Sequence, residues 1–137
     1  MNIYDVIILG GGPSGLTAAI YKSRAKLNTL VLAGNPPGGQ LMWTTEVENF
    51  PGFEHGIMGP ELIENMRKQA QRFGTKFADE NVTKITGSFE NNFTLTTQNN
   101  NEYKAKSIIV ATGASAKWLH IPSEQKLRGK GVSACAT

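Results

Sequence analysis

The chain contains 137 residues, 39% of them hydrophobic and 18% charged, which fits one globular domain with a buried core and excludes an intrinsically disordered protein. Fourteen Lys and Arg against eleven Asp and Glu leave a net charge of +3 without a basic cluster, so we expect no nucleic-acid partner. No apolar run approaches the roughly 18 residues of a membrane span and no secretory signal is evident, so we expect neither membrane association nor secretion.

The single cysteine, Cys135, excludes a disulfide framework within these residues, and the reducing cytoplasm is the expected location. A lone cysteine is commonly a buried, unreactive residue. A cysteine that two residues follow can also be the first half of a Cys-x-x-Cys motif. The cysteine alone leaves both interpretations open. We expect no metal site.

The N-terminal part of the chain predicts a strand, a helix and a second strand. Residues 4–9 and 29–32 are short apolar runs rich in β-branched residues, which are typical of buried parallel strands. The intervening helix has small and apolar residues at helical spacing, at Leu16, Ala19, Ile20 and Ser23. Together they predict a βαβ unit with a right-handed crossover.

A long connection and a second helix follow. Residues 33–58 are rich in Gly, Pro, Thr and Asn, and a loop of this length in a compact domain is usually functional. The second helix is predicted to begin near Pro60 and to stop at Gly74. Its apolar face is predicted to contain Leu62, Ile63, Met66, Ala70 and Phe73.

Short β-like runs separated by asparagine turns follow the second helix. They lie at residues 82–86, 93–97 and 103–106 and predict a small antiparallel meander. Residues 108–111 then have the pattern of a separate, fully buried strand. We therefore predict an α/β fold of the Rossmann type, in which a parallel sheet with helices carries a small antiparallel β-meander.

The segment ILGGGPSGLTAA has Gly10, Gly12 and Gly15 in the G-x-G-x-x-G spacing of dinucleotide-binding loops. The pattern is weak alone, but here it follows a strand and opens a helix, as such a loop requires. Gly10 is expected to permit the tight turn, Gly12 to admit a pyrophosphate and Gly15 to let the helix pack closely on the strand. The helix N-terminus would then face the phosphates.

An NAD site usually has an Asp or Glu at the end of the second strand, about 20 residues after the glycines. Here residues 33–35 are Ala-Gly-Asn, and no acid occurs before Glu46. No Arg or Lys lies between Leu32 and Gln40 to bind a 2′-phosphate. A simple NAD(P) dehydrogenase is therefore disfavoured, although Asn35 or backbone groups could bind a ribose.

Five motifs then point to a family. They are GGGPSG at 10–15, GGQL at 38–41, TTEVENFPG at 44–52, IIVATGASAKWL at 108–119 and GVSACAT at 131–137. Together they resemble the low-molecular-weight thioredoxin reductases, within the FAD-dependent pyridine nucleotide–disulfide oxidoreductase class. The resemblance covers essentially the whole chain. Many flavoproteins share the glycine loop, whereas the combination of the other motifs is much more specific. Many members of this family also lack the acid after the second strand.

The resemblance implies an FAD site built from several segments. The pyrophosphate would bind at the glycine loop, the adenosine near the turn after residue 32, and the flavin or its ribityl chain near residues 40–49, with a second FAD loop at residues 111–113. The implied FAD-binding residues are Gly10, Gly12, Pro13, Ser14, Gly15, Ala33, Gly34, Gly38, Gly39, Gln40, Leu41, Asn49, Val82, Ala111, Thr112 and Gly113.

The resemblance also implies a role for Cys135. It corresponds to the outer cysteine of a redox-active pair, whose partner would be at position 138, and its thiolate would attack the disulfide of thioredoxin. Residues 1–137 would form the N-terminal part of an FAD domain, without the NADPH domain and the C-terminal FAD segment, and we expect them to be inactive alone. The implied parent is a cytoplasmic homodimer that passes electrons from NADPH through FAD and the disulfide to thioredoxin.

Two other interpretations remain open. One is a related FAD-dependent enzyme, either a ferredoxin–NADP reductase or a peroxiredoxin-reducing flavoprotein. Ferredoxin reductases of this type lack Cys-x-x-Cys, so the Ala-Cys-Ala-Thr of residues 134–137 argues against them. The other is a non-catalytic nucleotide-binding module, which a flavin absorption spectrum would distinguish from both enzymes.

Overall fold

The computed structural model describes residues 3–134, and Cys135 therefore lies outside the described residues. The strands are β1 (Ile3–Leu9), β2 (Thr29–Leu32), β3 (Glu46–Val47), β4 (Ile57–Met58), β5 (Lys76–Ala78), β6 (Val82–Ser88), β7 (Asn92–Thr97) and β8 (Glu102–Val110). The helices are α1 (Pro13–Arg24), α2 (Gly59–Arg72) and α3 (Pro122–Leu127), with a 3₁₀ helix, η1, at Gly39–Trp43. No helix in the described range is both long and apolar enough to span a membrane.

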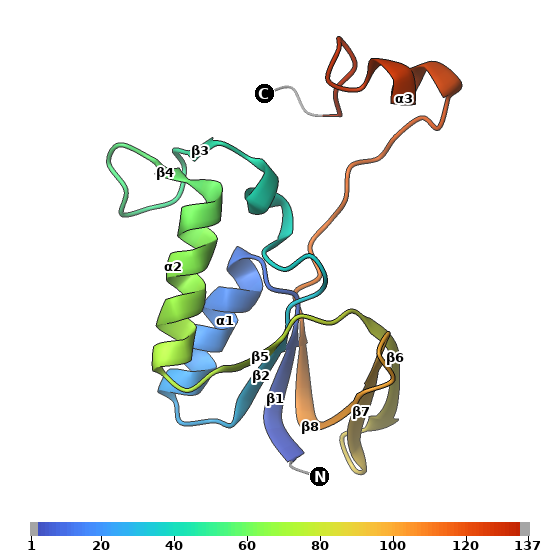
Figure 1. Ribbon diagram of the computed structural model, residues 1–137. Helices are drawn as coiled ribbons and strands as arrows, with labels where there is room; N and C mark the ends of the chain where they lie inside the picture. The colour runs from blue at the N-terminus through green and yellow to red at the C-terminus, as the bar shows by residue number, and fades with distance from the viewer. Residues whose placement is uncertain (1–2, 135–137) are drawn as a thin grey trace.

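A mixed six-stranded sheet in the order β5-β2-β1-β8-β7-β6 forms the centre of the fold (Figure 1). β1 pairs in parallel with β2 on one side and β8 on the other, and β2 pairs in parallel with β5. β6, β7 and β8 pair antiparallel. Because β1 has a sheet neighbour on both sides and side chains packed on both faces, its residues from Val6 to Leu9 are buried, as the sequence predicts.

The two faces of β1 belong to different parts of the core. Val6 and Ile8 pack with Ala19 of α1 and Ala70 of α2, so both long helices cover the same face. On the opposite face, Ile7 and Leu9 share a cluster with Leu95 of β7. In Figure 1 the helices accordingly lie to one side of β1 and the meander to the other. The alternation of side chains along one strand therefore joins the helices and the meander into one folded unit.

Both long helices form where the sequence predicts them. Each has a proline in its first turn, Pro13 and Pro60, where no intrahelical N–H is needed. α2 ends just before Gly74, which has a φ of 97° that favours glycine. The predicted apolar face of α2 is buried at Leu62, Ile63, Met66 and Ala70.

The predicted strands after residue 100 need correction. Residues 103–106 and 108–111 are not separate elements, because β8 runs unbroken from Glu102 to Val110. Nor is its second half fully buried, since Val110 is 70% exposed. The reason is that β7 pairs with β8 only as far as Ala105, so the remainder of β8 has β1 as its single sheet neighbour. The sequence patterns did not predict five short elements, which are β3, β4, β5, η1 and α3.

Candidate functional site

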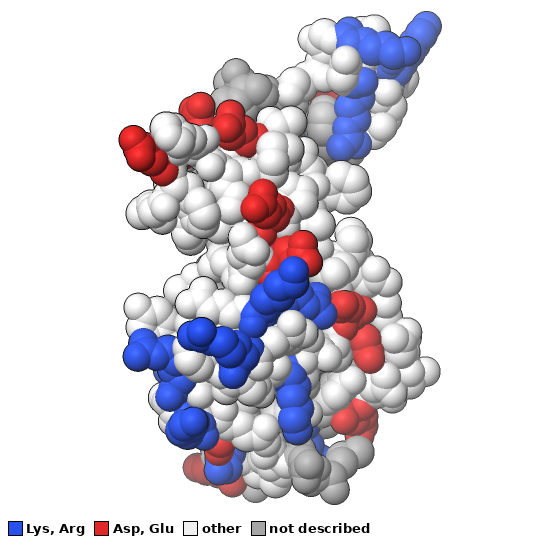
Figure 2. All heavy atoms as spheres, turned by 60° about the vertical axis from the view of Figure 1, so that its left-hand side comes forward, with Lys and Arg blue, Asp and Glu red and all other residues white. Residues whose placement is uncertain are grey.

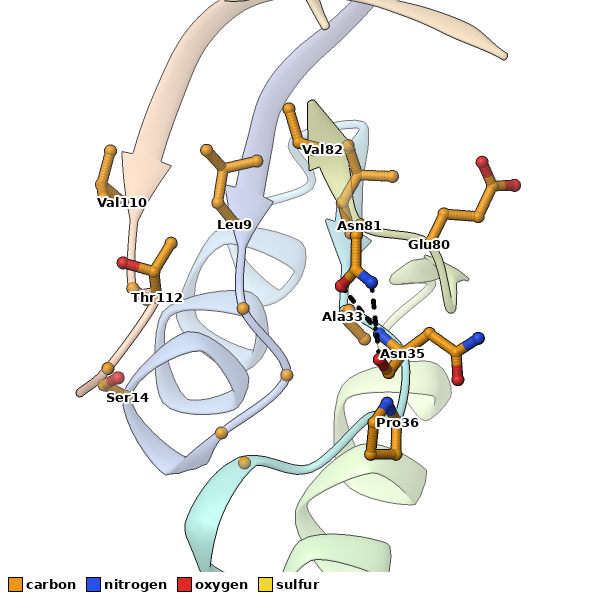
Figure 3. Close-up of a pocket in the computed structure, with 18 of the residues that line it drawn as sticks. Leu9, Ser14, Ala33, Asn35, Pro36, Glu80, Asn81, Val82, Val110 and Thr112 are labelled. Atoms are coloured by element: carbon orange, nitrogen blue, oxygen red, sulfur yellow. Dashed lines mark hydrogen bonds between the residues drawn. The ribbon is translucent and has the colours of Figure 1, made fainter. Parts of the chain in front are cut away.

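A cleft of about 890 Å³ opens where β1, β2 and β8 end (Figure 3). This is the carboxyl edge of the parallel strands, where ligands of open α/β sheets bind, and the volume suits a small-molecule site. The residues implicated from sequence that line it are Gly10, Gly12, Pro13, Ser14, Ala33, Gly34, Gly39, Gln40, Leu41, Val82, Ala111, Thr112 and Gly113.

The three motif glycines have different surroundings. Gly10 has a φ of 114°, and a Cβ at this position would lie 2.2 Å from the carbonyl oxygen of Ala111. A Cβ on Gly15 would lie 2.0 Å from the carbonyl oxygen of Gly10, so Gly15 lies behind the loop and lets α1 approach β1. A Cβ on Gly12 would meet only the carbonyl oxygen of Gly38, at 3.9 Å. Gly12 is therefore the position where the loop leaves room for a ligand.

The N-terminus of α1 faces the same cleft. The first hydrogen bond at this end runs from the N–H of Leu16 to the carbonyl of Gly12, so the N–H groups of the preceding helical residues lack intrahelical partners. The first turn contains no acidic residue that would compete for them. Ser14 is exposed at this end of the cleft and contributes a hydroxyl (Figure 3). Free N–H donors and the helix dipole together favour an anionic group here.

An amide side chain organises the cleft wall beyond β2. The Oδ1 of Asn81 accepts a hydrogen bond from the N–H of Asn35 at 3.0 Å, and its Nδ2 donates to the carbonyl of Asn35 at 3.4 Å (Figure 3). The same Nδ2 donates to Gln98 at 2.9 Å. Asn81 therefore fixes the backbone of the turn after β2, where the acid of an NAD site is absent.

One acidic residue does reach the cleft, but it is engaged elsewhere. Glu80 accepts hydrogen bonds from the hydroxyl of Thr97, the amide of Asn101 and the hydroxyl of Tyr103. The bond from Thr97, with smaller contributions from the other two, lowers the pKa of Glu80, although partial burial opposes this. The carboxylate is thus ionised and held against the meander, and in Figure 3 it points away from the glycine loop.

The segment of η1 supplies a further wall. The Nε2 of Gln40 donates to the carbonyl of Ala114, which links η1 to the turn after β8. Gly38 instead lines an adjacent apolar hollow. Asn49 lies on the loop between β3 and β4, which lines a different depression, and is not brought to the cleft. Three of the residues implicated from sequence, Gly15, Gly38 and Asn49, therefore lie outside the cleft lining.

Sequence reasoning missed the part of the cleft that follows β5. Glu80, Asn81, Lys84 and Ile85 reach it because β5 pairs with β2 and directs the next residues past the end of β2. β5 contains only Lys, Phe and Ala, so its pattern is too short and mixed to be recognised. The only sequence signal for this part of the cleft was the polar run at residues 79–81. It could not be recognised, because it has the composition of an ordinary loop.

A glycine turn between a buried strand and a helix, at the carboxyl edge of a parallel sheet, defines a dinucleotide-binding α/β domain. Residues 4–137 match the family model described as pyridine nucleotide-disulphide oxidoreductase. The chain belongs to this family.

Within this family, the chain is similar to proteins named thioredoxin reductase. Thioredoxin reductase from Rickettsia bellii is 52% identical over 96% of this chain and 42% of its own length, and that of Streptomyces coelicolor is 50% identical over 99% and 42%. Among solved structures, the thioredoxin reductase of Giardia duodenalis has a TM-score of 0.84 at 41% identity, covering 99% of this chain and 44% of its own. That of Lactococcus lactis has a TM-score of 0.82 at 43% identity, covering 90% and 40%.

The resemblance that the motifs indicate is thus confirmed, and the FAD-binding Rossmann-like fold of the thioredoxin reductases is the fold of this chain. The chain spans about 42% of the length of the curated relatives that it matches.

Proposed function

We propose that these residues bind FAD and belong to a thioredoxin reductase. The observation that carries the proposal is the opening at Gly12, where the glycine loop leaves room for a ligand in front of the free N–H groups of α1. A pyrophosphate is the anion that this arrangement suits. The absence of an acid at the end of β2 and the engagement of Glu80 by Thr97 argue against a simple NAD site.

The residues present fit FAD along the whole cleft. We assign the pyrophosphate to Gly12 and Ser14, the adenosine to the wall formed by residues 33–35 and Val82, and the flavin side to Gln40 and the turn at residues 111–113. The glycines at the cleft add no side chain: a Cβ on Gly113 would have no protein atom within 4 Å. When bound, FAD supplies a two-electron carrier between NADPH and a disulfide.

For the complete enzyme, we propose reduction of thioredoxin by NADPH in the cytoplasm. Support comes from relatives about 50% identical over nearly all of this chain that are thioredoxin reductases. We assign Cys135 as one half of the redox-active pair, because it lies in the Ala-Cys-Ala-Thr segment of that family's motif. A homodimer is part of the same proposal.

Titration of the chain with FAD, followed by backbone amide NMR, tests the cofactor assignment even when binding is weak. We expect saturable shifts at Gly12, Ser14 and Thr112. Gly12→Ala should raise the dissociation constant at least about 10-fold, because the new methyl group occupies the space assigned to the pyrophosphate. Gly12 has φ −79° and ψ −178°, extended backbone that alanine adopts, so the variant should fold normally.

Lys22→Ala, on the exposed surface of α1, is the control and should bind FAD like the unaltered chain. Gly12→Ala binding FAD with unchanged affinity would contradict the assignment. The activity is tested on the complete polypeptide: NADPH should bleach flavin absorption, and oxidised thioredoxin should restore it. A complete polypeptide that retains no flavin absorption after incubation with FAD and removal of the free cofactor would refute the proposal.

A further inference from the structure

The turn after β2 has few backbone donors of its own. Its sequence, Gly-Asn-Pro-Pro-Gly at residues 34–38, contains two prolines, which have no N–H. The glycines at its two ends have positive φ values, 83° at Gly34 and 104° at Gly38, in a region that glycine adopts freely. A turn of this composition needs support from another segment to keep a single conformation.

The side chain of Asn81 provides that support. Its Oδ1 accepts a hydrogen bond from the N–H of Asn35 at 3.0 Å, and its Nδ2 donates to the carbonyl of the same residue at 3.4 Å (Figure 3). Both polar groups of the Asn35 backbone are thus paired with one side chain. An amide can make this pair because it carries a donor and an acceptor side by side, whereas a carboxylate lacks the donor. We call this arrangement the Asn35–Asn81 pair.

Asn81 is itself held by the antiparallel meander. Its carbonyl accepts a hydrogen bond from the N–H of Gln98 at 2.9 Å, and its Nδ2 donates to Oε1 of Gln98 at 2.9 Å. Nδ2 carries two N–H bonds, and one is used by Gln98 and the other by the turn. Asn81 therefore joins the meander to the turn, and its side chain has no N–H donor left for a ligand.

The turn that Asn81 holds forms one side of the cleft. Asn35, Pro36 and Asn81 lie on this side in Figure 3, whereas Ser14 and Thr112 lie on the other. The proposed function assigns the first side to the adenosine of FAD, and the second to the pyrophosphate and the flavin. Loss of the Asn35–Asn81 pair should therefore disturb the binding of one half of FAD only.

We propose that Asn81 is a positioning residue that sets the preference of the cleft for FAD over FMN. FMN contains the flavin and one phosphate but lacks the adenosine. With the Asn35–Asn81 pair in place, the adenosine binds to a wall that is already formed. Without the pair, the turn must become ordered when the adenosine binds, and this entropy cost weakens binding. FMN does not reach the turn, so its affinity does not depend on Asn81.

The inference rests on the FAD site of the proposed function, but its first test needs no ligand. In the free chain, Asn81→Ala should speed hydrogen exchange of the Asn35 amide with water at least about 5-fold in NMR, because this N–H loses its acceptor. Asn81 is exposed, so the variant should fold normally. Unchanged amide shifts in β1 would verify the fold.

The second test compares two ligands in NMR titrations of the 137-residue chain. Asn81→Ala should raise the dissociation constant of FAD at least about 5-fold, the effect of about one hydrogen bond, and change that of FMN by less than about 2-fold. Asn91→Ala, at an exposed position in the turn between β6 and β7, is the matched control and should change neither constant.

Binding by charge alone cannot produce this difference. Several Lys and Arg side chains lie together on the lower half of the face shown in Figure 2, where an anionic flavin can bind without a specific site. Asn81→Ala leaves the net charge unchanged, so it does not alter such binding. Titration at about 0.15 M salt reduces it further.

The possible failures are distinguishable. Unchanged exchange of the Asn35 amide, unchanged affinity for FAD, or an equal loss of affinity for FAD and FMN would overturn the role of Asn81 and leave the FAD site in place. If the unaltered chain does not bind FAD, the proposed cofactor site is refuted, and the preference that rests on it is refuted as well.

Discussion

At the scale of single residues, Glu80 is held as an anion by donors from three positions in and beside the meander. The hydroxyl of Thr97, which is 1% exposed, donates to Oε2, and the amide of Asn101 and the hydroxyl of Tyr103 reach the same carboxylate. Desolvation of the Tyr103 hydroxyl and the charge of Glu80 raise the pKa of Tyr103 in turn. The carboxylate therefore joins the β5–β6 connection to β7 and to β8.

Replacement of Glu80 by Gln should make stability less dependent on pH. The folded pKa of Glu80 is lowered from its ordinary value of 4.5, so its contribution is present above that value and is lost as pH falls through the folded pKa. We expect the free energy of unfolding of the unaltered chain to fall below about pH 5, and that of the variant to fall less steeply. At pH 7 the variant should be less stable by about 1 kcal/mol.

Urea denaturation at several pH values between about 3 and 7 measures both effects. Glu90→Gln, an exposed residue at the turn between β6 and β7, is the control and should retain the pH dependence of the unaltered chain. An equally steep fall in the Glu80→Gln variant would show that the Thr97 hydrogen bond does not stabilise the charged form.

The residues of the cleft differ in how far sequence reveals them. Gly10 and Gly12 in the cleft, with Gly15 behind them, could be predicted because the strand, the turn and the helix around them are contiguous in sequence. Glu80 and Asn81 could not, because they reach the cleft only through the pairing of β5 with β2. A local sequence pattern predicts the conformation of the segment that contains it. The residues of the cleft wall depend instead on which strands pair in the sheet.

At the scale of elements, β8 explains why part of the fold was mispredicted. Its first half pairs with β7 and β1, and its second half pairs with β1 alone. The sequence follows this change of neighbours: Lys104 and Lys106 alternate with less polar residues, and after Ser107 the strand ends in an apolar run at residues 108–110. The two patterns suggest two strands, although the backbone continues through Ser107, whose hydroxyl donates to the carbonyl of Asp5 at 2.8 Å.

Leu95→Ala should test whether the meander folds as one unit with the parallel sheet. Leu95 is fully buried and packs in the same cluster as Ile7 and Leu9 of β1. Removing its side chain should cost about 2–5 kcal/mol of unfolding free energy, and unfolding should remain a single transition. Leu119→Ala, at a position 78% exposed, should change stability by less than about 0.5 kcal/mol. A separate early transition in the Leu95 variant would mean that the meander unfolds independently.

At the scale of the whole molecule, the described part of the C-terminal arm lies outside the hydrophobic core. Among the residues that the structure describes, none beyond Ala111 belongs to the three hydrophobic clusters. The arm, residues 114–134, extends away from the sheet in Figure 1 and is held by contacts of its own. The carboxylate of Glu124 accepts hydrogen bonds from the N–H groups of Leu119 and His120, both at 2.8 Å, and Arg128 stacks on Trp118.

A chain shortened to residues 1–114 should therefore keep the stability of the 137-residue chain. It retains all three clusters and the bond from Gln40 to Ala114, so its unfolding free energy should change by less than about 0.5 kcal/mol in urea denaturation. In limited digestion with trypsin, followed by mass spectrometry, the first cut should come at or beyond Lys117. Lys104, within β8, should be protected, because cleavage there requires the central sheet to open. A loss of more than about 1.5 kcal/mol on truncation, or a first cut before residue 110, would mean that the arm stabilises the domain.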